Sequence, residues 1–189
     1  MDRIVVASAN AGKIREIASL IKGVKVLGYK DLGLDFDIEE SGNTFFENAL
    51  IKARAVYNKT GIPVLSDDSG LEVFALNGAP GIYSARYSAV RTDDANIRKL
   101  LEELRDKTDR RARFSCCMVY YDGKRIITET GTTEGEILKE KQGNGGFGYD
   151  PVFYSYDLKK SFGVSTPEEK NSVSHRSRAL AKIIKRVTE

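Results

Sequence analysis

A short apolar run followed at once by the pattern of an amphipathic helix is the feature that most restricts how this chain can fold. Residues 4–7 read Ile-Val-Val-Ala, which is typical of a strand buried on both faces. After this run, apolar residues recur at helical spacing at Ile14, Ile17, Ala18 and Ile21. Because buried strands that alternate with helices form sheets covered by helices, this beginning indicates an α/β fold.

The remaining sequence continues this alternation and adds an antiparallel section in its second half. Strands are expected at residues 24–27, 64–65, 112–121, 125–130 and 134–138, with a hairpin turn at Asp122-Gly123, and residues 71–76 are again apolar. Helices are expected from Thr44 to about residue 60, over residues 93–105, and from Thr166 to the C-terminus with a break near Asn171-Ser172. The polar residues 66–70 are expected to form a loop.

The composition excludes several classes of protein. The chain has 189 residues, 41% of them hydrophobic, so one domain can bury a sufficient core without a disulfide. Its net charge is +3, and its pI of about 8.7 fits anionic ligands but falls short of the pI above ~9 that is expected of a dedicated nucleic-acid module. The adjacent Cys116 and Cys117 point to opposite faces of a strand and cannot bridge each other. Neither a signal-peptide core nor the ~20 apolar residues of a membrane helix is found, so we expect a soluble, cytoplasmic protein.

The first candidate site lies between residues 4–7 and the helix that follows. Ser8, Asn10 and Lys13 occupy this turn, where the free N–H groups and the dipole of a helix N-terminus attract phosphate. Lys13 stands at the end of the helix where a cation is unfavourable, which favours a role in gripping an anion. The alternative is a capped surface helix with a solvated lysine.

Two pairs of carboxylates form the second candidate site. Asp67 and Asp68, followed by Ser69, come after the expected strand 64–65, where open α/β sheets bind ligands. Glu39-Glu40 is a similar pair just before a helix. Mg²⁺ is held by one or two carboxylates together with phosphate oxygens, so these pairs favour a magnesium site. The alternative is turn formation and capping, for which Asp, Ser and Gly are common.

Two further candidates lie in the last third of the chain. The four glycines within residues 143–148 require a loop, in which Phe147 and Tyr149 offer rings for stacking on a flat ligand. His175, the only histidine, stands five residues after Lys170, about 140° around a continuous helix. Both side chains reach one ligand only if the helix breaks between them. The alternatives are a plain hairpin loop and a structural histidine.

Six motifs are spread in order over most of the chain. They are Ser8-x-Asn10-x-x-Lys13, Glu40-Ser41-Gly42-x-Thr44-Phe45-x-Glu47-Asn48-Ala49-x-x-Lys52-Ala53, Ser66-Asp67-Asp68-Ser69-Gly70-Leu71, Pro80-Gly81-Ile82-Tyr83-Ser84-Ala85-Arg86, Gly146-Phe147-Gly148-Tyr149-Asp150-Pro151 and Glu169-Lys170-Asn171-x-x-Ser174-His175-Arg176. Any one motif is weak, but together they closely resemble the Ham1/inosine triphosphate pyrophosphatase family. The one departure is Ser8, where many relatives carry threonine, and both residues supply a hydroxyl.

The resemblance implies Mg²⁺-dependent hydrolysis of deaminated purine nucleoside triphosphates, those of inosine, deoxyinosine and xanthosine, to the monophosphate and pyrophosphate. It implies one domain over residues 1–189, with an elongated mixed α/β sheet flanked by helices and two lobes that enclose the substrate. Residues 112–138 would belong to a smaller or dimer-forming antiparallel part. Family members are usually homodimers, and neither nucleic acid nor a membrane is an expected partner.

The resemblance also implies roles for the phosphate end of the site. Glu40 and Asp68 would hold Mg²⁺, with Glu39 or Asp67 as alternative ligands. Asp68 would also accept the proton of the attacking water, and Lys13 would share in catalysis. The residues that would bind the triphosphate are Ser8, Asn10, Lys13, Lys52 and Ser69.

The base end of the site would distinguish deaminated purines from adenine. Phe147 would stack on the base, and Lys170 would reach a phosphate or the base. Donors to the 6-oxo group would come from Arg176 and from the backbone around Tyr149 to His175, and the residues expected at this end also include Gly148 and Asp150. Since adenine carries an amino donor at this position, mismatched donors can discriminate by roughly 10⁴–10⁵.

Two other functions remain as alternatives. A Maf-like pyrophosphatase for modified pyrimidines shares the lysine-bearing first loop and the acidic pair, but lacks Ser174-His175-Arg176 after a Gly-Phe-Gly-Tyr-Asp loop. A nucleic-acid or nucleotide-binding module without turnover is favoured only by the basic residues Arg110, Arg111 and Arg113. Binding to DNA phosphates would weaken steeply with salt.

Overall fold

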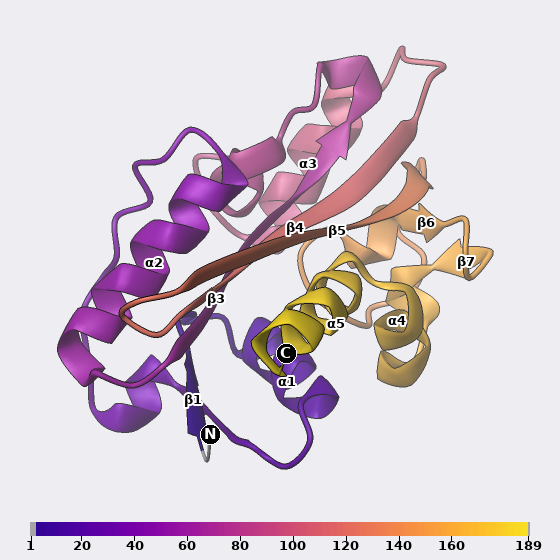
Figure 1. The fold of residues 1–189 in the computed structure, drawn as a ribbon. Helices are drawn as coiled ribbons and strands as arrows, with labels where there is room; N and C mark the ends of the chain where they lie inside the picture. The colour runs from indigo at the N-terminus through magenta and orange to yellow at the C-terminus, as the bar shows by residue number, and fades with distance from the viewer. Residues whose placement is uncertain (1–2, 189) are drawn as a thin grey trace. The chain divides into compact units, whose positions relative to one another are not determined.

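The computed structural model describes residues 3–188, which divide into two compact units. Unit 1 contains the described residues up to Asp68, residues Cys116–Gly131 and those from Arg176 onward. Unit 2 contains Ser69–Ser115 and Thr132–His175. The strands hydrogen-bond in the order β2-β1-β3-β4-β5-β6-β7 (Figure 1). Strand β1 is parallel to β2 and β3, whereas β6 is antiparallel to β5 and β7, so the sheet is mixed as expected.

The helices and strands have the following bounds. The strands are β1 (Arg3–Val6), β2 (Lys25–Gly28), β3 (Val64–Val73), β4 (Arg111–Tyr121), β5 (Ile126–Ile137), β6 (Phe153–Ser155) and β7 (Lys160–Ser161). The α-helices are α1 (Ala11–Leu20), α2 (Phe45–Thr60), α3 (Asp93–Glu103), α4 (Pro167–Val173) and α5 (His175–Thr188). Short 3₁₀ helices cover Tyr29–Leu32, Phe74–Leu76, Gly81–Arg86, Asp150–Val152 and Phe162–Val164.

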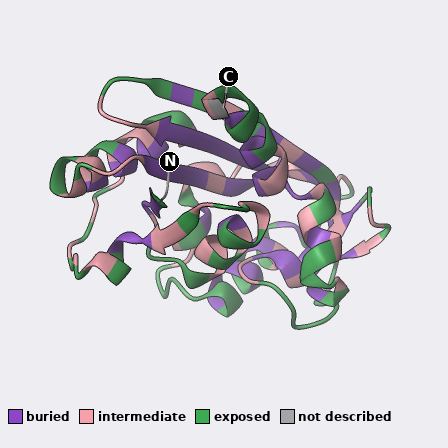
Figure 2. Cartoon of the chain, turned by 60° about the horizontal axis from the view of Figure 1, so that its bottom comes forward, coloured by how far each residue is buried: buried purple, intermediate pink, exposed green. Residues whose placement is uncertain are grey.

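Unit 1 buries both faces of its part of the sheet. Because successive strand residues point to opposite faces, β1 contributes Ile4 and Val6 to one core and Val5 to the other. The first core contains Ile17 of α1 together with residues of α5, and the second contains residues of α2. Burial on both faces explains why residues 4–7 form a continuous apolar run (Figure 2).

Unit 2 has one core of its own. It combines the ends of β3, β4 and β5 with α3 and β6, and its buried members are Leu71, Val73, Ile97, Leu100, Leu104, Ala112, Phe114, Ile137, Tyr149, Val152, Phe153 and Phe162. Strands β3, β4 and β5 each contribute residues to both units, so the segment 112–138 is divided between them. No helix among residues 3–188 is long and apolar enough to traverse a bilayer.

Several element boundaries differ from the expectation. Residues 66–70 do not form a loop, because β3 is continuous from Val64 to Val73. Likewise, residues 134–138 are not a separate strand, since β5 continues without a break to Ile137. Ala18 is exposed on α1 rather than buried in the core. The break in the C-terminal helix is confirmed, but it lies at Ser174, whose backbone is extended.

Candidate active site

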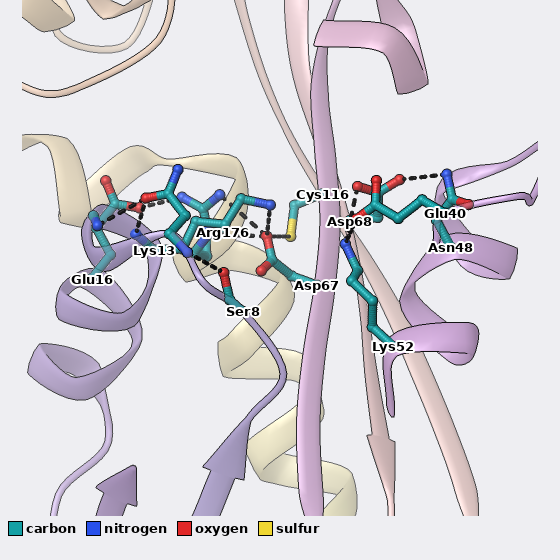
Figure 3. Close-up of polar contacts among 12 residues, drawn as sticks. Ser8, Lys13, Glu16, Glu40, Asn48, Lys52, Asp67, Asp68, Cys116 and Arg176 are labelled. Atoms are coloured by element: carbon teal, nitrogen blue, oxygen red, sulfur yellow. Dashed lines mark hydrogen bonds and ion pairs between the residues drawn. The ribbon is translucent and has the colours of Figure 1, made fainter. Parts of the chain in front are cut away.

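The adjacent carboxylates Asp67 and Asp68 lie within β3 and extend to opposite sides of it (Figure 3). This arrangement follows from the alternation of side chains along a strand. The side chain of Asp67 is fully buried, and that of Asp68 is 8% exposed. The strand can carry two buried acidic residues because cations contact it on both sides. The prediction that the pair lies in a loop is wrong, and the two carboxylates belong to separate groups.

The first group, called the Asp67 group, consists of Asp67, Lys13, Arg176 and Glu16. The Lys13 Nζ lies 3.0 Å from Asp67 Oδ2, and Arg176 donates to the same oxygen from Nε and Nη2 at 3.3 and 3.2 Å. Arg176 also donates from Nη1 to the Glu16 carboxylate. Its side chain is 1% exposed, so the guanidinium is buried between carboxylates of α1 and β3.

The charges in the Asp67 group favour the ionised carboxylate. Burial alone raises the pKa of Asp67, but the positive charges of Lys13 and Arg176 outweigh it and hold the pKa well below its usual range. Burial lowers the pKa of Arg176, and Asp67 and Glu16 reverse this effect, so that the pKa is raised overall. The group is therefore a compact network in which every charge has an opposite neighbour.

The N-terminus of α1 positions Lys13 beside this network. Asn10 caps the helix, because its Oδ1 accepts from the backbone N–H groups of Gly12 and Lys13 at 2.8 and 3.2 Å. Ser8 Oγ accepts from the Asn10 N–H at 3.1 Å. Lys13 therefore lies close to the turn that holds Ser8 and Asn10, as expected. A helix N-terminus with an adjacent ammonium group suits an anionic ligand.

The second group, called the Asp68 group, consists of Asp68, Glu40, Lys52 and Asn48. The Lys52 Nζ lies 2.5 Å from Glu40 Oε1 and 3.4 Å from Asp68 Oδ1. Asn48 Nδ2 donates to Asp68 Oδ2 at 3.1 Å. Asn48 and Lys52 stand four residues apart on α2, so one face of the helix supplies both donors.

In the Asp68 group, burial has the larger effect on the acid. It raises the pKa of Asp68, and the nearby Lys52 only partly offsets it, so the pKa lies above its usual value. For Lys52, burial lowers the pKa, but the charges of Asp68 and Glu40 together outweigh it and the pKa is raised. A partly buried carboxylate with a raised pKa beside a charged partner is typical of functional sites.

The residues present fit a magnesium ion that is completed by other ligands. Among the residues that the structure describes, no group of three or more His, Cys, Asp and Glu side chains forms a metal site. Glu40 and Asp68 share the neighbour Lys52, whereas Asp67 lies on the other side of β3 and Glu39 is exposed. Mg²⁺ commonly takes one or two carboxylates and fills its other positions with water and phosphate oxygens. The pair Glu40 and Asp68 therefore suits Mg²⁺ better than either alternative.

Unit 2 contains the residues expected at the base end except Arg176, which belongs to unit 1 and contacts Asp67 and Glu16 instead. Lys170 Nζ forms a buried ion pair with Asp150 Oδ2 at 2.6 Å and lies 4.5 Å from the centre of the Phe147 ring. The same carboxylate oxygen accepts from the Phe147 N–H at 2.8 Å, which anchors the glycine-rich loop. Lys170 and Asp150 thus hold Phe147 in place, and Ser69 lies half-buried on β3.

Three other residues of this set make hydrogen bonds or ring contacts within the protein. The Tyr149 hydroxyl donates to the Ser84 carbonyl at 2.9 Å, and the Gly148 N–H donates to Asp93 at 2.7 Å. The buried His175 ring stacks on Phe114, with 4.8 Å between ring centres. His175 and Lys170 lie in separate helices, as the expected break requires.

Three residues in contact with the charged side chains of these groups had no role predicted from the sequence. Glu16 pairs with Arg176, the Cys116 thiol lies 3.9 Å from Asp67 Oδ2, and Asn48 contacts Asp68. Asn48 had a detectable signal, because it precedes Lys52 by one helical turn. The other two depend on packing between distant segments, which leaves no local pattern.

The fold and the two groups define an α/β protein in which buried carboxylates and cations flank one strand. The model of the Ham1 family matches residues 4–186, and the chain belongs to this family. A dITP/XTP pyrophosphatase of Treponema denticola is 49% identical, covering 96% of both chains, and one of Staphylococcus aureus is 47% identical, covering 95% of this chain and 93% of that protein. The solved Ham1 protein of Coxiella burnetii is 41% identical and superposes with a TM-score of 0.89, covering 100% of this chain and 99% of that one.

Proposed function

We propose that this chain hydrolyses the triphosphates of deaminated purine nucleosides to the monophosphate and pyrophosphate. The observation that carries the proposal is the placement of Lys13 and Lys52 on either side of one carboxylate-bearing strand. The two ammonium groups can neutralise charge on a phosphate chain, while a carboxylate of the strand can hold a divalent ion. The relatives named dITP/XTP pyrophosphatase support the same activity.

The Asp67 group and the N-terminus of α1 would bind the triphosphate. Ser8, Asn10 and Lys13 offer a hydroxyl, an amide and an ammonium group at the N-terminus of α1, where the helix dipole favours an anion. Attack at the α-phosphorus releases pyrophosphate, a leaving group of high negative charge. Catalysis therefore depends on positioning and charge neutralisation, which Lys13 and Lys52 would supply.

The Asp68 group would carry out the proton transfer. Asp68, with its raised pKa, would accept the proton of the attacking water. Mg²⁺ bound by Glu40 and Asp68 would neutralise charge on the phosphate oxygens. Lys52 would keep the two carboxylates together by contacting both of them.

The residues of unit 2 would select the base. Phe147, fixed by Asp150 and Lys170, would stack on the purine. Donors from the backbone near Tyr149 and from His175 would face the 6-oxo group of hypoxanthine or xanthine. Adenine would then place an amino donor against a donor, which buried sites reject strongly.

The first experiment measures pyrophosphate release from inosine, xanthosine, guanosine and adenosine triphosphates, with and without Mg²⁺. We expect metal-dependent release from the first two at rates at least about a hundredfold above adenosine triphosphate. Guanine shares the 6-oxo group, so the rate with guanosine triphosphate measures any further selection at the 2-amino position. Equal rates on all four would refute the base selection but keep the hydrolysis. A folded sample that releases no pyrophosphate would overturn the proposal. Light scattering of the same sample tests the homodimer that we also propose.

A further inference from the structure

Asn48 is a buried polar residue for which the proposed reaction gives no role. It is 0% exposed, and a buried amide is costly unless its hydrogen bonds are made. Its Nδ2 donates to Asp68 Oδ2 at 3.1 Å, and its Oδ1 accepts from the Gly42 N–H at 2.9 Å. One side chain therefore joins the carboxylate of β3 to the segment that carries Glu40 (Figure 3).

The backbone at Gly42 packs closely against the first turn of α2. A Cβ atom at Gly42 would lie 2.6 Å from Glu47 Cβ and 2.8 Å from Asn48 Oδ1. The neighbouring Asn43 N–H donates to Glu47 Oε2 at 2.6 Å, so a second side chain of α2 holds the same segment. The residues just after Glu40 are thus anchored to the first turns of α2.

The contact with Asp68 complements that of Lys52. Asn48 donates to Oδ2, whereas Lys52 lies against Oδ1, so each oxygen of the carboxylate has its own donor from one helix. Two donors on two oxygens fix the plane of the carboxylate. Because an ionised carboxylate offers about four lone-pair positions, acceptor sites remain for a cation.

We propose that Asn48 is a positioning residue, which sets the orientation of Asp68 and its separation from Glu40 for binding a divalent cation. This inference rests on the proposed function and deepens it. Asn48 acts through its hydrogen bonds to Asp68 and Gly42, and no direct contact with the substrate or the cation is assigned to it. Partners that orient metal ligands typically change metal affinity or activity by about 10–100-fold when they are removed.

A matched control exists in unit 2. Asn96 is also a buried helical asparagine, but its Oδ1 accepts from the Ser88 N–H at 2.7 Å and its Nδ2 donates to the Ala85 carbonyl at 3.3 Å. Both partners of Asn96 are backbone groups, and neither is a carboxylate. Replacing either asparagine with alanine therefore removes the same side-chain groups, while only Asn48→Ala releases Asp68.

The test compares Asn48→Ala, Asn96→Ala and the wild type. Binding of Mn²⁺ to the nucleotide-free protein is measured by electron paramagnetic resonance, and kcat and KM are measured with inosine triphosphate. We expect Asn48→Ala to weaken Mn²⁺ binding by about 10–100-fold and to lower kcat by a similar factor, with KM changed much less. Asn96→Ala should keep wild-type Mn²⁺ affinity and kcat even where urea unfolding shows a similar loss of stability.

A second variant keeps the test decisive if Asn48→Ala does not fold. Gly42→Ala forces the segment away from Asn48 but leaves the donor to Asp68, so a smaller loss of Mn²⁺ affinity is expected. Wild-type Mn²⁺ affinity in Asn48→Ala, or an equal loss in Asn96→Ala, would overturn the inference.

Deuterium exchange separates this inference from the proposed function. Asn48→Ala should speed amide exchange in residues 40–43 relative to both the wild type and Asn96→Ala. A wild type that binds no Mn²⁺ would overturn the inference. A wild type that binds Mn²⁺ but releases no pyrophosphate contradicts only the proposed function, and the exchange result then decides the role of Asn48. Unchanged exchange in Asn48→Ala would refute that role.

Discussion

The surroundings on the two sides of β3 shift the pKa values of two neighbouring carboxylates in opposite directions. Burial disfavours the ionised form of both, but Lys13 and Arg176 reverse this effect at Asp67, whereas Lys52 does not reverse it at Asp68. Folding therefore stabilises ionised Asp67, whose pKa is lowered, and opposes ionised Asp68, whose pKa is raised. Asp67 therefore mainly stabilises the fold, whereas the ionised form of Asp68 is disfavoured by folding, which suits a role in catalysis.

Replacing Asp68 with asparagine should have the largest effect on activity. Asp68→Asn removes both the proton acceptor and a ligand for Mg²⁺, so turnover should fall by about 10³–10⁴-fold, which is roughly 4–5 kcal/mol of barrier. Because burial disfavours the charge at this position, the free energy of unfolding should stay the same or rise. Pyrophosphate release and urea unfolding of the same sample measure both quantities.

The matched change on the other side of β3 should reverse this pattern. Asp67→Asn leaves Lys13 and the buried Arg176 without their shared counter-ion, so the unfolding free energy should fall by about 3 kcal/mol or more. Equal stability of Asp67→Asn and Asp68→Asn in urea would contradict the difference between the two carboxylates. So would full turnover by Asp68→Asn.

The pH dependence of stability sharpens the same contrast. The folded-state pKa of Asp67 lies below that of the unfolded chain, near 3.9, so its contribution is complete above about pH 5. The contribution declines as the pH falls below about 4 and is lost through the lowered pKa. The stability difference between wild type and Asp67→Asn, measured by urea unfolding, should therefore shrink between about pH 5 and pH 3. A difference that grows on acidification would contradict this assignment.

Local patterns in the sequence predicted most helices and strands. They gave a wrong prediction at residues 66–70, where charged side chains are buried. The strand at residues 4–7 and the caps at Thr44 and Thr166 are set by neighbouring residues, so they were found. The polar residues 66–70 also have turn composition, yet they form the middle of β3. They stay extended because Lys13, Arg176 and Lys52, from three different helices, neutralise the two carboxylates.

The site was predicted in the same uneven way. Motif resemblance selected Asp68, Glu40 and Lys52, and these three do lie together. The sequence left Asp67 as an alternative metal ligand, because strand alternation cannot be applied to residues assigned to a loop. Once β3 is known to be continuous, the separation of Asp67 from Asp68 follows from geometry alone.

A change in unit 2 should affect substrate binding rather than turnover. Phe147→Ala removes the proposed stacking surface, which is worth about 1–3 kcal/mol per base, so KM for inosine triphosphate should rise by about tenfold or more. The value of kcat should change little, because neither carboxylate of β3 is altered. Phe74→Ala serves as the control, since Phe74 is an exposed aromatic residue of the same unit outside the proposed site. Equal KM values for the two variants would remove Phe147 from base binding.

The smallest expected effect compares the caps of two helices. Thr44 Oγ1 accepts from the Glu47 N–H at 3.1 Å at the start of α2, and Thr92 Oγ1 accepts from the Ala95 N–H at 3.3 Å at the start of α3. Thr44→Ala and Thr92→Ala should each lower the unfolding free energy by about 1 kcal/mol.

Only the first of these helices carries groups that contact Asp68. Fraying at the start of α2 disturbs Asn48 and, one turn later, Lys52, whereas fraying of α3 leaves the Asp68 group untouched. Thr44→Ala should therefore lower turnover of inosine triphosphate a few-fold, and Thr92→Ala should retain wild-type turnover at the same loss of stability. If both variants lose turnover in proportion to their loss of stability, the loss of turnover reflects general destabilisation. The precise placement of α2 would then not determine the activity of Asp68.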